Sequence, residues 1–234
     1  MPALLLQANQ LKAERCCAGQ PVERVDGFSG AFPPGTVCEL MGPENGGKHL
    51  LWRLLTLLQR PTEGDMIIGD QSMITLAEGE MAAVRNRDYG YLFAIPYLLP
   101  GFTVVENVAM PLFKLRQVEP AQARTRTEAV LRATGLLEVA SAQLGELSAL
   151  QHQLVALARA MIHGPVFLAV ERFGENLTET ETARLSEICQ YVAEWSAVSV
   201  IATAAPGLTL PWANLKFEIE NGRVTENAGI PGRS

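Results

Sequence analysis

The stretch VCELMGPENGGKHLLWRLLTLLQ, residues 37–59, holds the strongest structural signal in this chain. The apolar run Val37–Met41 is typical of a buried strand, and leucines at helical intervals over 48–59 predict a helix. The turn between them fits G-x-x-x-x-G-K, in which backbone N–H groups at a helix start face an anion and the lysine reaches the β- and γ-phosphates. A glycine-rich turn without a ligand also fits this motif alone. The context favours a nucleotide phosphate loop formed by Gly42, Pro43, Glu44, Asn45, Gly46, Gly47, Lys48 and His49.

Outward from this loop, strand patterns alternate with helical patterns, and this alternation predicts an α/β fold. From Val104 to about Leu147 the pattern is helical and comparatively charged, with Pro111 and Pro120 as breaks, which indicates an inserted helical subdomain. Asn221-Gly222 predicts a hairpin before a polar end. The other predicted strands are Ala3–Leu6, Pro21–Phe28, Gly64–Gly69, Tyr89–Phe93, Val166–Val170 and Ala197–Ala204, and the other helices are Glu78–Arg87 and Gln151–His163.

The composition excludes several classes of protein. The chain has 234 residues, 48% apolar and 19% charged, as in ordinary globular domains. Its net charge of −6 and pI near 5.2 leave no basic footprint, so nucleic acid is not an expected partner. No run reaches the roughly 18 apolar residues of a membrane span, and the N-terminus reads as a strand because it lacks the basic region of a signal peptide.

Cysteine and histidine residues form no metal-binding or disulfide pattern. Cysteines stand at 16, 17, 38 and 189 without a C-x-x-C pair, which favours a reducing compartment. We interpret His152 and His163 as solvated or capping residues, because their spacing with His49 matches no ligand set.

Four further segments occur in the order known from one family: RNRDYGYLF at 85–93, LLPGFTVVENVAMPL at 98–112, LSALQHQLVALARAM at 147–161 and NGRV at 221–224. Together with the phosphate loop they resemble the ATP-binding subunits of ABC transporters over roughly residues 3–226, and most resemble the lipoprotein-releasing and macrolide-exporter branch.

The resemblance implies an α/β fold with a P-loop NTPase-type core, an antiparallel β subdomain and an inserted helical subdomain. The core and β subdomain are expected in 1–93 and 151–226, the helical subdomain in about 94–150, and a polar tail in 227–234. The family's signature motif falls on Leu147, Ser148, Ala149, Leu150 and Gln151.

Two motifs depart from the family at the residues that hold metal and activate water. His49 replaces the Ser or Thr hydroxyl that ligates Mg²⁺, which prefers oxygen ligands. In VFLAVERFGENL, Glu171 takes the place of the metal-holding aspartate and Arg172 that of the catalytic glutamate. A guanidinium stays protonated and therefore does not deprotonate water, whereas Glu171 could still hold a metal.

Three more departures lie elsewhere in the chain. Ala94 replaces the family's γ-phosphate-sensing glutamine, Ala204 replaces its switch histidine, and Ala149-Leu150 replaces the paired glycines of the signature. Arg15 takes the place of an adenine-stacking aromatic residue in a weaker alignment. We expect weakened ATP binding, doubtful Mg²⁺ binding and loss of normal hydrolysis, with Ala94, Glu171, Arg172 and Ala204 as degenerate positions.

Glu44 adds a carboxylate to the cradle, and it should repel phosphate by about 1–4 kcal/mol at 4 Å. We expect Arg172, and also Lys48, to pair with Glu171 or Glu44 where a γ-phosphate would lie.

The resemblance also implies partners. An integral-membrane permease should dock on the helical subdomain, on the cytoplasmic face of the inner membrane, and a second ATPase-like subunit should pair with this chain as a homodimer or heterodimer. In a heterodimer with an intact ATPase, both composite sites would contain a defect. A slow ATPase that drives export of a lipoprotein or lipophilic substrate, and a soluble regulator, are the alternatives. The expected docking cluster is Phe93, Tyr97, Leu98, Leu99 and Phe102.

Overall fold

The segment at 37–59 forms a strand, a loop and a helix in the computed structural model, which describes residues 4–15, 23–115 and 119–228. Strand β3 (Val37–Met41) is almost wholly buried, and helix α1 (Lys48–Leu55) follows the loop at once. The helix ends at Leu55, short of the predicted residue 59, because the backbone turns at Leu57, whose φ is +60°.

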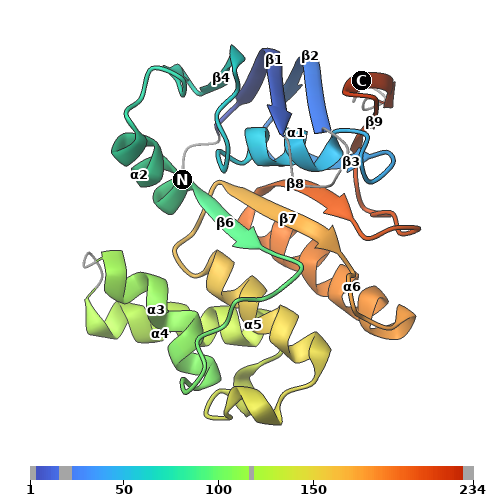
Figure 1. Cartoon of the computed structure of the whole chain (residues 1–234). Helices are drawn as coiled ribbons and strands as arrows, with labels where there is room; N and C mark the ends of the chain where they lie inside the picture. The colour runs from blue at the N-terminus through green and yellow to red at the C-terminus, as the bar shows by residue number, and fades with distance from the viewer. Residues whose placement is uncertain (1–3, 16–22, 116–118, 229–234) are drawn as a thin grey trace, which may run out of the picture.

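A six-stranded sheet forms the centre of the molecule (Figure 1). Five neighbouring strands of this sheet, β9, β3, β8, β7 and β6, run parallel. The sixth strand, β10, pairs antiparallel with β9. Asn221 and Gly222 both have positive φ, as a two-residue type I′ hairpin requires, so the predicted hairpin is confirmed. The strand order is β10 (Arg223–Ala228), β9 (Leu215–Glu220), β3, β8 (Ser199–Ala204), β7 (Phe167–Phe173) and β6 (Tyr89–Leu92).

A second, antiparallel sheet covers α1 on the side away from the central sheet (Figure 1). Its first strand was predicted at Ala3–Leu6, but β1 begins at Leu6 and runs on; residues 1–3 lie outside the described residues. A bulge at Gln10, whose φ is +50°, breaks the alternation that would have identified the strand. The order is β2 (Glu23–Phe32), β1 (Leu6–Arg15), β4 (Glu63–Ile68) and β5 (Gln71–Ser72).

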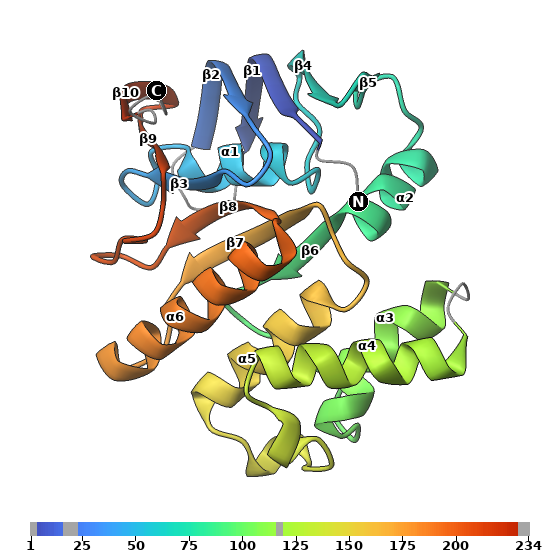
Figure 2. The same cartoon turned by 180° about the vertical axis from the view of Figure 1, so that it is seen from behind.

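Most helices pack on the other face of the central sheet and beyond it (Figure 2), whereas the helix at Glu78–Asp88 buries Met81 and Val84 in the core on the α1 side. The prediction had not identified α6 as a separate helix; its Thr178 side chain caps the helix by accepting from the Glu181 N–H, and the helix buries Leu185 and Val192. The helices are α2 (Glu78–Asp88), α3 (Val104–Leu115), α4 (Pro120–Ala133), α5 (Ala149–Met161) and α6 (Glu179–Ser196), with short 3-10 turns at Leu137–Val139 and Leu144–Glu146.

Pro111 does not break the helical region, contrary to the prediction, because it lies inside α3. A proline there removes one helix hydrogen bond, and burial of the neighbouring Val108 and Leu112 offsets that loss. Pro120 stands at the first position of α4, as predicted for a boundary.

The apolar core has two parts that meet at the central sheet. One fills the space around α1 and both sheets, with Trp52 and Phe32 among its largest members, and the other packs α3 to α6 against the sheet. The predicted α/β fold with an antiparallel sheet and a helical part is therefore confirmed.

The C-terminal prediction needs one correction. Strand β10 extends through Ala228, so residues 227–228 belong to a strand and not to the predicted tail. The rest of that tail, 229–234, lies outside the described residues. Among the described residues, no helix is long and apolar enough to cross a membrane.

Candidate nucleotide-binding site

The loop at 42–49 is shaped by glycines at its two ends. Gly42 and Gly47 have φ of +127° and +105°, and a Cβ on either would collide with a backbone carbonyl, that of Ile219 or of Arg24. Only glycine fits at both positions without displacing the chain. The loop is thus held against β2 and the β9–β10 hairpin, with Lys48 at the first turn of α1.

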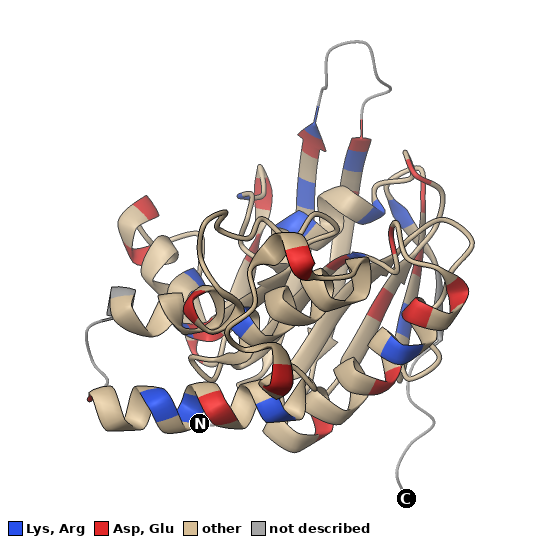
Figure 3. Ribbon diagram, turned by 90° about the horizontal axis from the view of Figure 1, so that it is seen from below, with Lys and Arg blue, Asp and Glu red and all other residues tan. Residues whose placement is uncertain are grey.

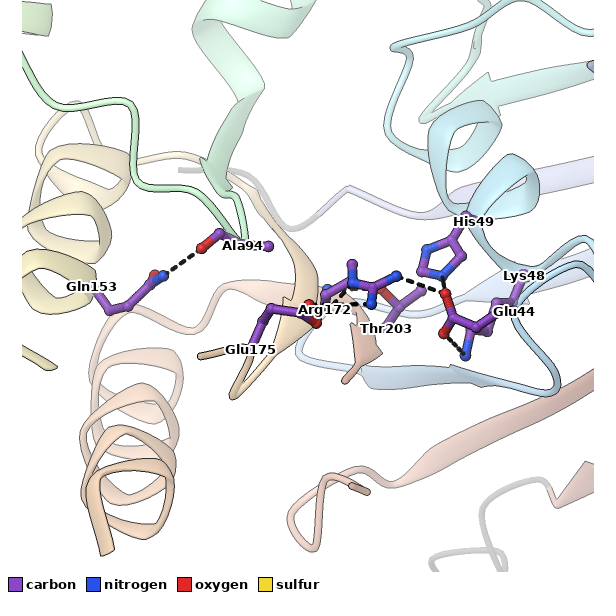
Figure 4. A network of polar contacts seen from close by, with 8 residues as sticks. All are labelled: Glu44, Lys48, His49, Ala94, Gln153, Arg172, Glu175 and Thr203. Atoms are coloured by element: carbon purple, nitrogen blue, oxygen red, sulfur yellow. Dashed lines mark hydrogen bonds and ion pairs between the residues drawn. The ribbon is translucent and has the colours of Figure 1, made fainter. Parts of the chain in front are cut away.

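Glu44 lies among three basic residues, Lys48 and His49 of this loop and Arg172 of β7 (Figure 4). Its Oε1 is 3.2 Å from Lys48 Nζ, and its Oε2 is 2.6 Å from Arg172 Nη1 and 3.4 Å from His49 Nε2. The Lys48 side chain is only 8% exposed, so its charge is poorly screened by water. The Glu44 carboxylate therefore pairs with the lysine that contacts phosphate in this motif.

Arg172 connects the loop to the central sheet. Its guanidinium donates to Glu44 and also to Glu175, with Nε 2.8 Å from Glu175 Oε2, and its backbone N–H donates to Thr203 Oγ1 at 2.9 Å. The φ of Arg172 is +48°, a conformation that costs a side-chain-bearing residue on the order of 1 kcal/mol. The hydrogen bond to the buried Thr203 helps to hold it there.

The expected pairing of Arg172 and Lys48 with Glu44 is present, whereas the pairing with Glu171 was wrong. Arg172 has a left-handed φ of +48° where the register of β7 shifts between Val170 and Phe173, and its guanidinium pairs with Glu44 and Glu175. Among the described residues, Glu171 lies within 4.0 Å of no basic side chain, and no group of three His, Cys, Asp or Glu residues is placed to hold a metal.

Ala204 and the loop line one cavity of about 410 Å³, together with Lys48 and Glu44. Ala94 lies elsewhere: its carbonyl accepts a hydrogen bond from the Gln153 side chain of α5 at 2.8 Å (Figure 4). The structure thus brings Arg172 and Ala204 to the loop and places Ala94 beside α5.

The signature residues 147–151 form the start of α5. Ser148 caps this helix by accepting from the Gln151 N–H at 3.2 Å, and the Gln151 side chain accepts from the Ser148 N–H at 2.8 Å. None of these residues lines the cavity beside the phosphate loop. Leu150 packs against the helical core.

Glu175, Thr203 and Gln153 are contact residues that the sequence reasoning missed. Glu175 had one signal in the sequence, since it is a carboxylate that follows Arg172 by three residues. Thr203 and Gln153 act through contacts with distant segments and gave no local pattern. His152 and His163 each place a ring nitrogen where its N–H donates to a backbone carbonyl, of Ser148 and Tyr89, which agrees with structural roles.

The Glu44 carboxyl should make the stability of the fold depend on pH. Burial raises its pKa, but hydrogen bonds from Arg172 and Lys48 outweigh burial and hold the pKa below its ordinary value of 4.5. The ionised carboxylate therefore stabilises the fold above about pH 4.5, and this contribution is lost as the pH falls through the lower folded pKa.

We expect the Glu44→Gln variant to be less stable than the wild type at pH 7, with a difference that shrinks below about pH 4.5. Urea unfolding between pH 3 and 7 measures this. A stability difference that stays constant down to pH 3 would contradict the ion-pair assignment.

Charge on the molecule is mixed. Lys and Arg are interspersed with Asp and Glu in the view from below, with no basic face gathered there (Figure 3).

His49, which faces Glu44, has its pKa lowered by burial, so the imidazole is mainly neutral near pH 7. The ionised side chains of the loop and of its neighbours Arg172 and Glu175 are then two positive, Lys48 and Arg172, and two negative, Glu44 and Glu175.

Known proteins resemble this chain in sequence and in fold. The family model described as ABC transporter matches residues 25–170. The lipoprotein-releasing system ATP-binding protein LolD of Bordetella avium is 31% identical over 87% of this chain and 88% of its own length. That of Chromohalobacter salexigens is 30% identical over 89% and 88%.

Two solved structures share the fold at lower identity. A dimeric ATP-binding cassette in a post-hydrolysis state, bound to ADP and Pi, superposes with a TM-score of 0.82 at 20% identity, covering 97% of this chain and 99% of its own. CbiO1 of Clostridium perfringens, part of the ABC transporter complex CbiONQ, gives 0.83 at 16% identity over 96% and 88%. The family match and the two LolD relatives together place this chain in the ABC transporter family, as an ATP-binding subunit.

Proposed function

We propose that this subunit is a pseudo-ATPase, which docks on a membrane permease and supports or regulates a transporter-like complex at the cytoplasmic face of the inner membrane. The observation that carries the proposal is the ion pair between Arg172 and Glu44, 2.6 Å apart, with Lys48 on the other carboxylate oxygen. These contacts put an internal anion where a bound nucleotide would place its phosphates.

The residues present do not fit Mg-ATP well. A triphosphate that enters the loop meets the Glu44 carboxylate, and at 4 Å this repulsion costs about 1–4 kcal/mol. His49 supplies no hydroxyl for Mg²⁺. The weakened binding of ATP and Mg²⁺ therefore follows from the side chains that line the loop.

The substitutions should lower the rate of ATP hydrolysis more than they lower the affinity for ATP. Phosphoryl transfer depends on positioned groups that orient water and stabilise charge, and each lost group costs orders of magnitude. Arg172 offers no base, because its guanidinium stays protonated and is held between Glu44 and Glu175. Ala94 and Ala204 carry only methyl groups at the two sensing positions.

The surface for partners supports a docking role. Of the expected cluster, Tyr97 and Phe102 are 65% and 44% exposed, whereas Phe93, Leu98 and Leu99 are partly buried. Leu98 packs against the helical core and so serves the fold. The dimeric cassette and the CbiONQ complex support a paired subunit and a permease as the partners of this chain.

ATP turnover tests the proposal. We expect the chain, purified with its permease, to release phosphate from ATP no faster than the Lys48→Ala variant of the same complex. Permease-stimulated turnover that the Lys48→Ala change abolishes would overturn the pseudo-ATPase assignment.

The second candidate is a slow ATPase that drives export of a lipoprotein or lipophilic substrate, as the name of the LolD relatives suggests. Glu171 favours it, because this carboxylate has no basic partner within 4.0 Å among the described residues and so is available to a metal. Tight binding of Mg-ATP that the Glu171→Gln variant loses would support this candidate.

A further inference from the structure

A cleft of about 660 Å³ lies between α3, α4 and the 3-10 turn at Leu137–Val139, and it is larger than the cavity of about 410 Å³ beside the phosphate loop. The two helices lie side by side in the helical part of the fold (Figure 2). None of the phosphate-loop residues 42–49 lines this cleft, so the nucleotide chemistry of the loop does not account for it. Its volume falls within the range of about 300–1,000 Å³ that is common for small-molecule sites.

The walls of the cleft are mostly apolar. Ala109 and Leu112 of α3 and Leu131 of α4 are buried and form its floor. Phe113 and Leu137 also line the cleft, and their side chains are 69% and 38% exposed. An apolar surface that runs from a buried floor to an open edge is costly to leave in water. Covering this surface with an apolar group is therefore favourable.

One charged group of the cleft has no partner of opposite charge. Arg124 and Glu128 line the cleft one turn apart on α4. Glu128 is paired, since its Oε1 lies 3.0 Å from Nη2 of Arg132. No carboxylate of residues 4–15, 23–115 and 119–228 lies within 4.0 Å of the Arg124 guanidinium. The cleft therefore combines an apolar interior with a single uncompensated cation.

The polar side chains of the cleft offer little to a peptide backbone. Thr127 is buried, and its hydroxyl already donates to the Ala123 carbonyl at 2.8 Å. Glu128, as a carboxylate, is an acceptor and not a donor. An extended peptide in the cleft would bury carbonyl groups without donors, and each unpaired group costs free energy. An alkyl chain has no such groups.

We propose that the cleft binds a free long-chain carboxylate, whose alkyl chain lies between α3 and α4 and whose carboxylate pairs with Arg124. A guanidinium and a carboxylate form two parallel charge-assisted hydrogen bonds, and the apolar walls match the alkyl chain. One chain with one negative charge fits one cleft with one cation. This ligand site is separate from the proposed docking function and does not depend on it.

Isothermal titration calorimetry of the full chain with monomeric decanoate, dodecanoate and tetradecanoate tests the apolar walls. Each added pair of CH₂ groups should tighten binding about tenfold, because burial of the alkyl chain drives it. Ala109→Leu and Ala123→Leu add carbons to the cleft from α3 and from α4, and each should weaken dodecanoate binding about tenfold or more. Thermal unfolding checks that these two variants fold, and either one suffices for the test.

Arg124→Ala tests the pairing with the carboxylate. We expect this variant to bind decanoate about tenfold more weakly and to bind decanol, the uncharged alcohol of the same chain length, as the wild type does. A purely structural effect would weaken both ligands alike. Arg126→Ala is the matched control, because Arg126 is exposed on the same helix and does not line the cleft, and its affinity for decanoate should equal that of the wild type.

Three other results would overturn the carboxylate site. An affinity that does not rise with chain length, or that the folded leucine variants retain, would mean that the cleft is not where the ligand binds. Flotation with phosphatidylglycerol vesicles that Arg124→Ala abolishes, without binding of monomeric decanoate, would identify a bilayer surface as the partner. A dimer in sedimentation velocity that Ala109→Leu dissociates would show that a second copy of the chain covers the cleft.

Discussion

The Glu44→Ser variant should bind ATP about 10- to 100-fold more tightly than the wild type. The change removes the carboxylate from the loop and releases Lys48 and Arg172, which hold it at 3.2 and 2.6 Å. A repulsion of about 1–4 kcal/mol between like charges 4 Å apart is removed, and each 1.4 kcal/mol corresponds to a tenfold change in affinity. Isothermal titration calorimetry with ATP, in EDTA and in Mg²⁺, measures the effect.

Glu175→Ser is the control for this variant. Glu175 has the same charge and also pairs with Arg172, but it follows β7 and lies outside the 42–49 loop. We expect its effect on ATP affinity to be several times smaller. Equal gains in the two variants would mean that net charge alone is responsible, and no gain in Glu44→Ser would mean that Glu44 does not block the loop.

The tighter ATP binding expected for Glu44→Ser should not be accompanied by faster ATP hydrolysis. The Glu44→Ser variant still carries Arg172 at the position expected for the catalytic base, and Ala204 still offers only a methyl group to the cavity. Affinity and turnover are therefore separable in this chain. This separation also distinguishes the pseudo-ATPase from a slow ATPase, whose turnover at low ATP should rise with affinity.

The phosphate loop could be predicted because its signal is local. The strand, the glycines and the start of the helix are consecutive, and the backbone at Gly42 and Gly47 admits no other residue type. The pairing of Arg172 with Glu44 joins residues 128 positions apart, so the sequence offered Glu171 as an equal partner. In the fold, Arg172 has a φ of +48° at a register shift of β7 and pairs with Glu44 and Glu175, and no local sequence pattern indicates that backbone conformation.

Other features depended on tertiary packing and were missed for that reason. The alternation of apolar and polar residues fails at Gln10, where a bulge shifts the register. The predicted strand was therefore placed too early in the chain. Local propensity put a break at Pro111, but the buried neighbours of that residue keep α3 intact. The contacts of Thr203 and Gln153 have no sequence pattern, because each forms between segments distant in the chain.

The loop depends on α1, and the largest stability effect is expected at Trp52 in that helix. Its side chain is 0% exposed, its Nε1 donates to the Ile201 carbonyl of β8 at 3.1 Å, and its ring meets Phe93 edge-on. Trp52→Ala leaves a cavity and an unpaired carbonyl, which costs about 3–5 kcal/mol of unfolding free energy. For a chain of this size that lowers Tm by roughly 6–20 °C.

Trp195→Ala is the matched control, because this tryptophan on α6 is 54% exposed. Its loss should change the unfolding free energy by no more than about 0.5 kcal/mol. Urea unfolding and thermal melts of both variants test the contrast, and similar shifts in the two would contradict the burial of Trp52. Because α1 joins the 42–49 loop directly, a large loss in Trp52→Ala would also show that the cradle holding Glu44 is built on the same packing that stabilises the fold.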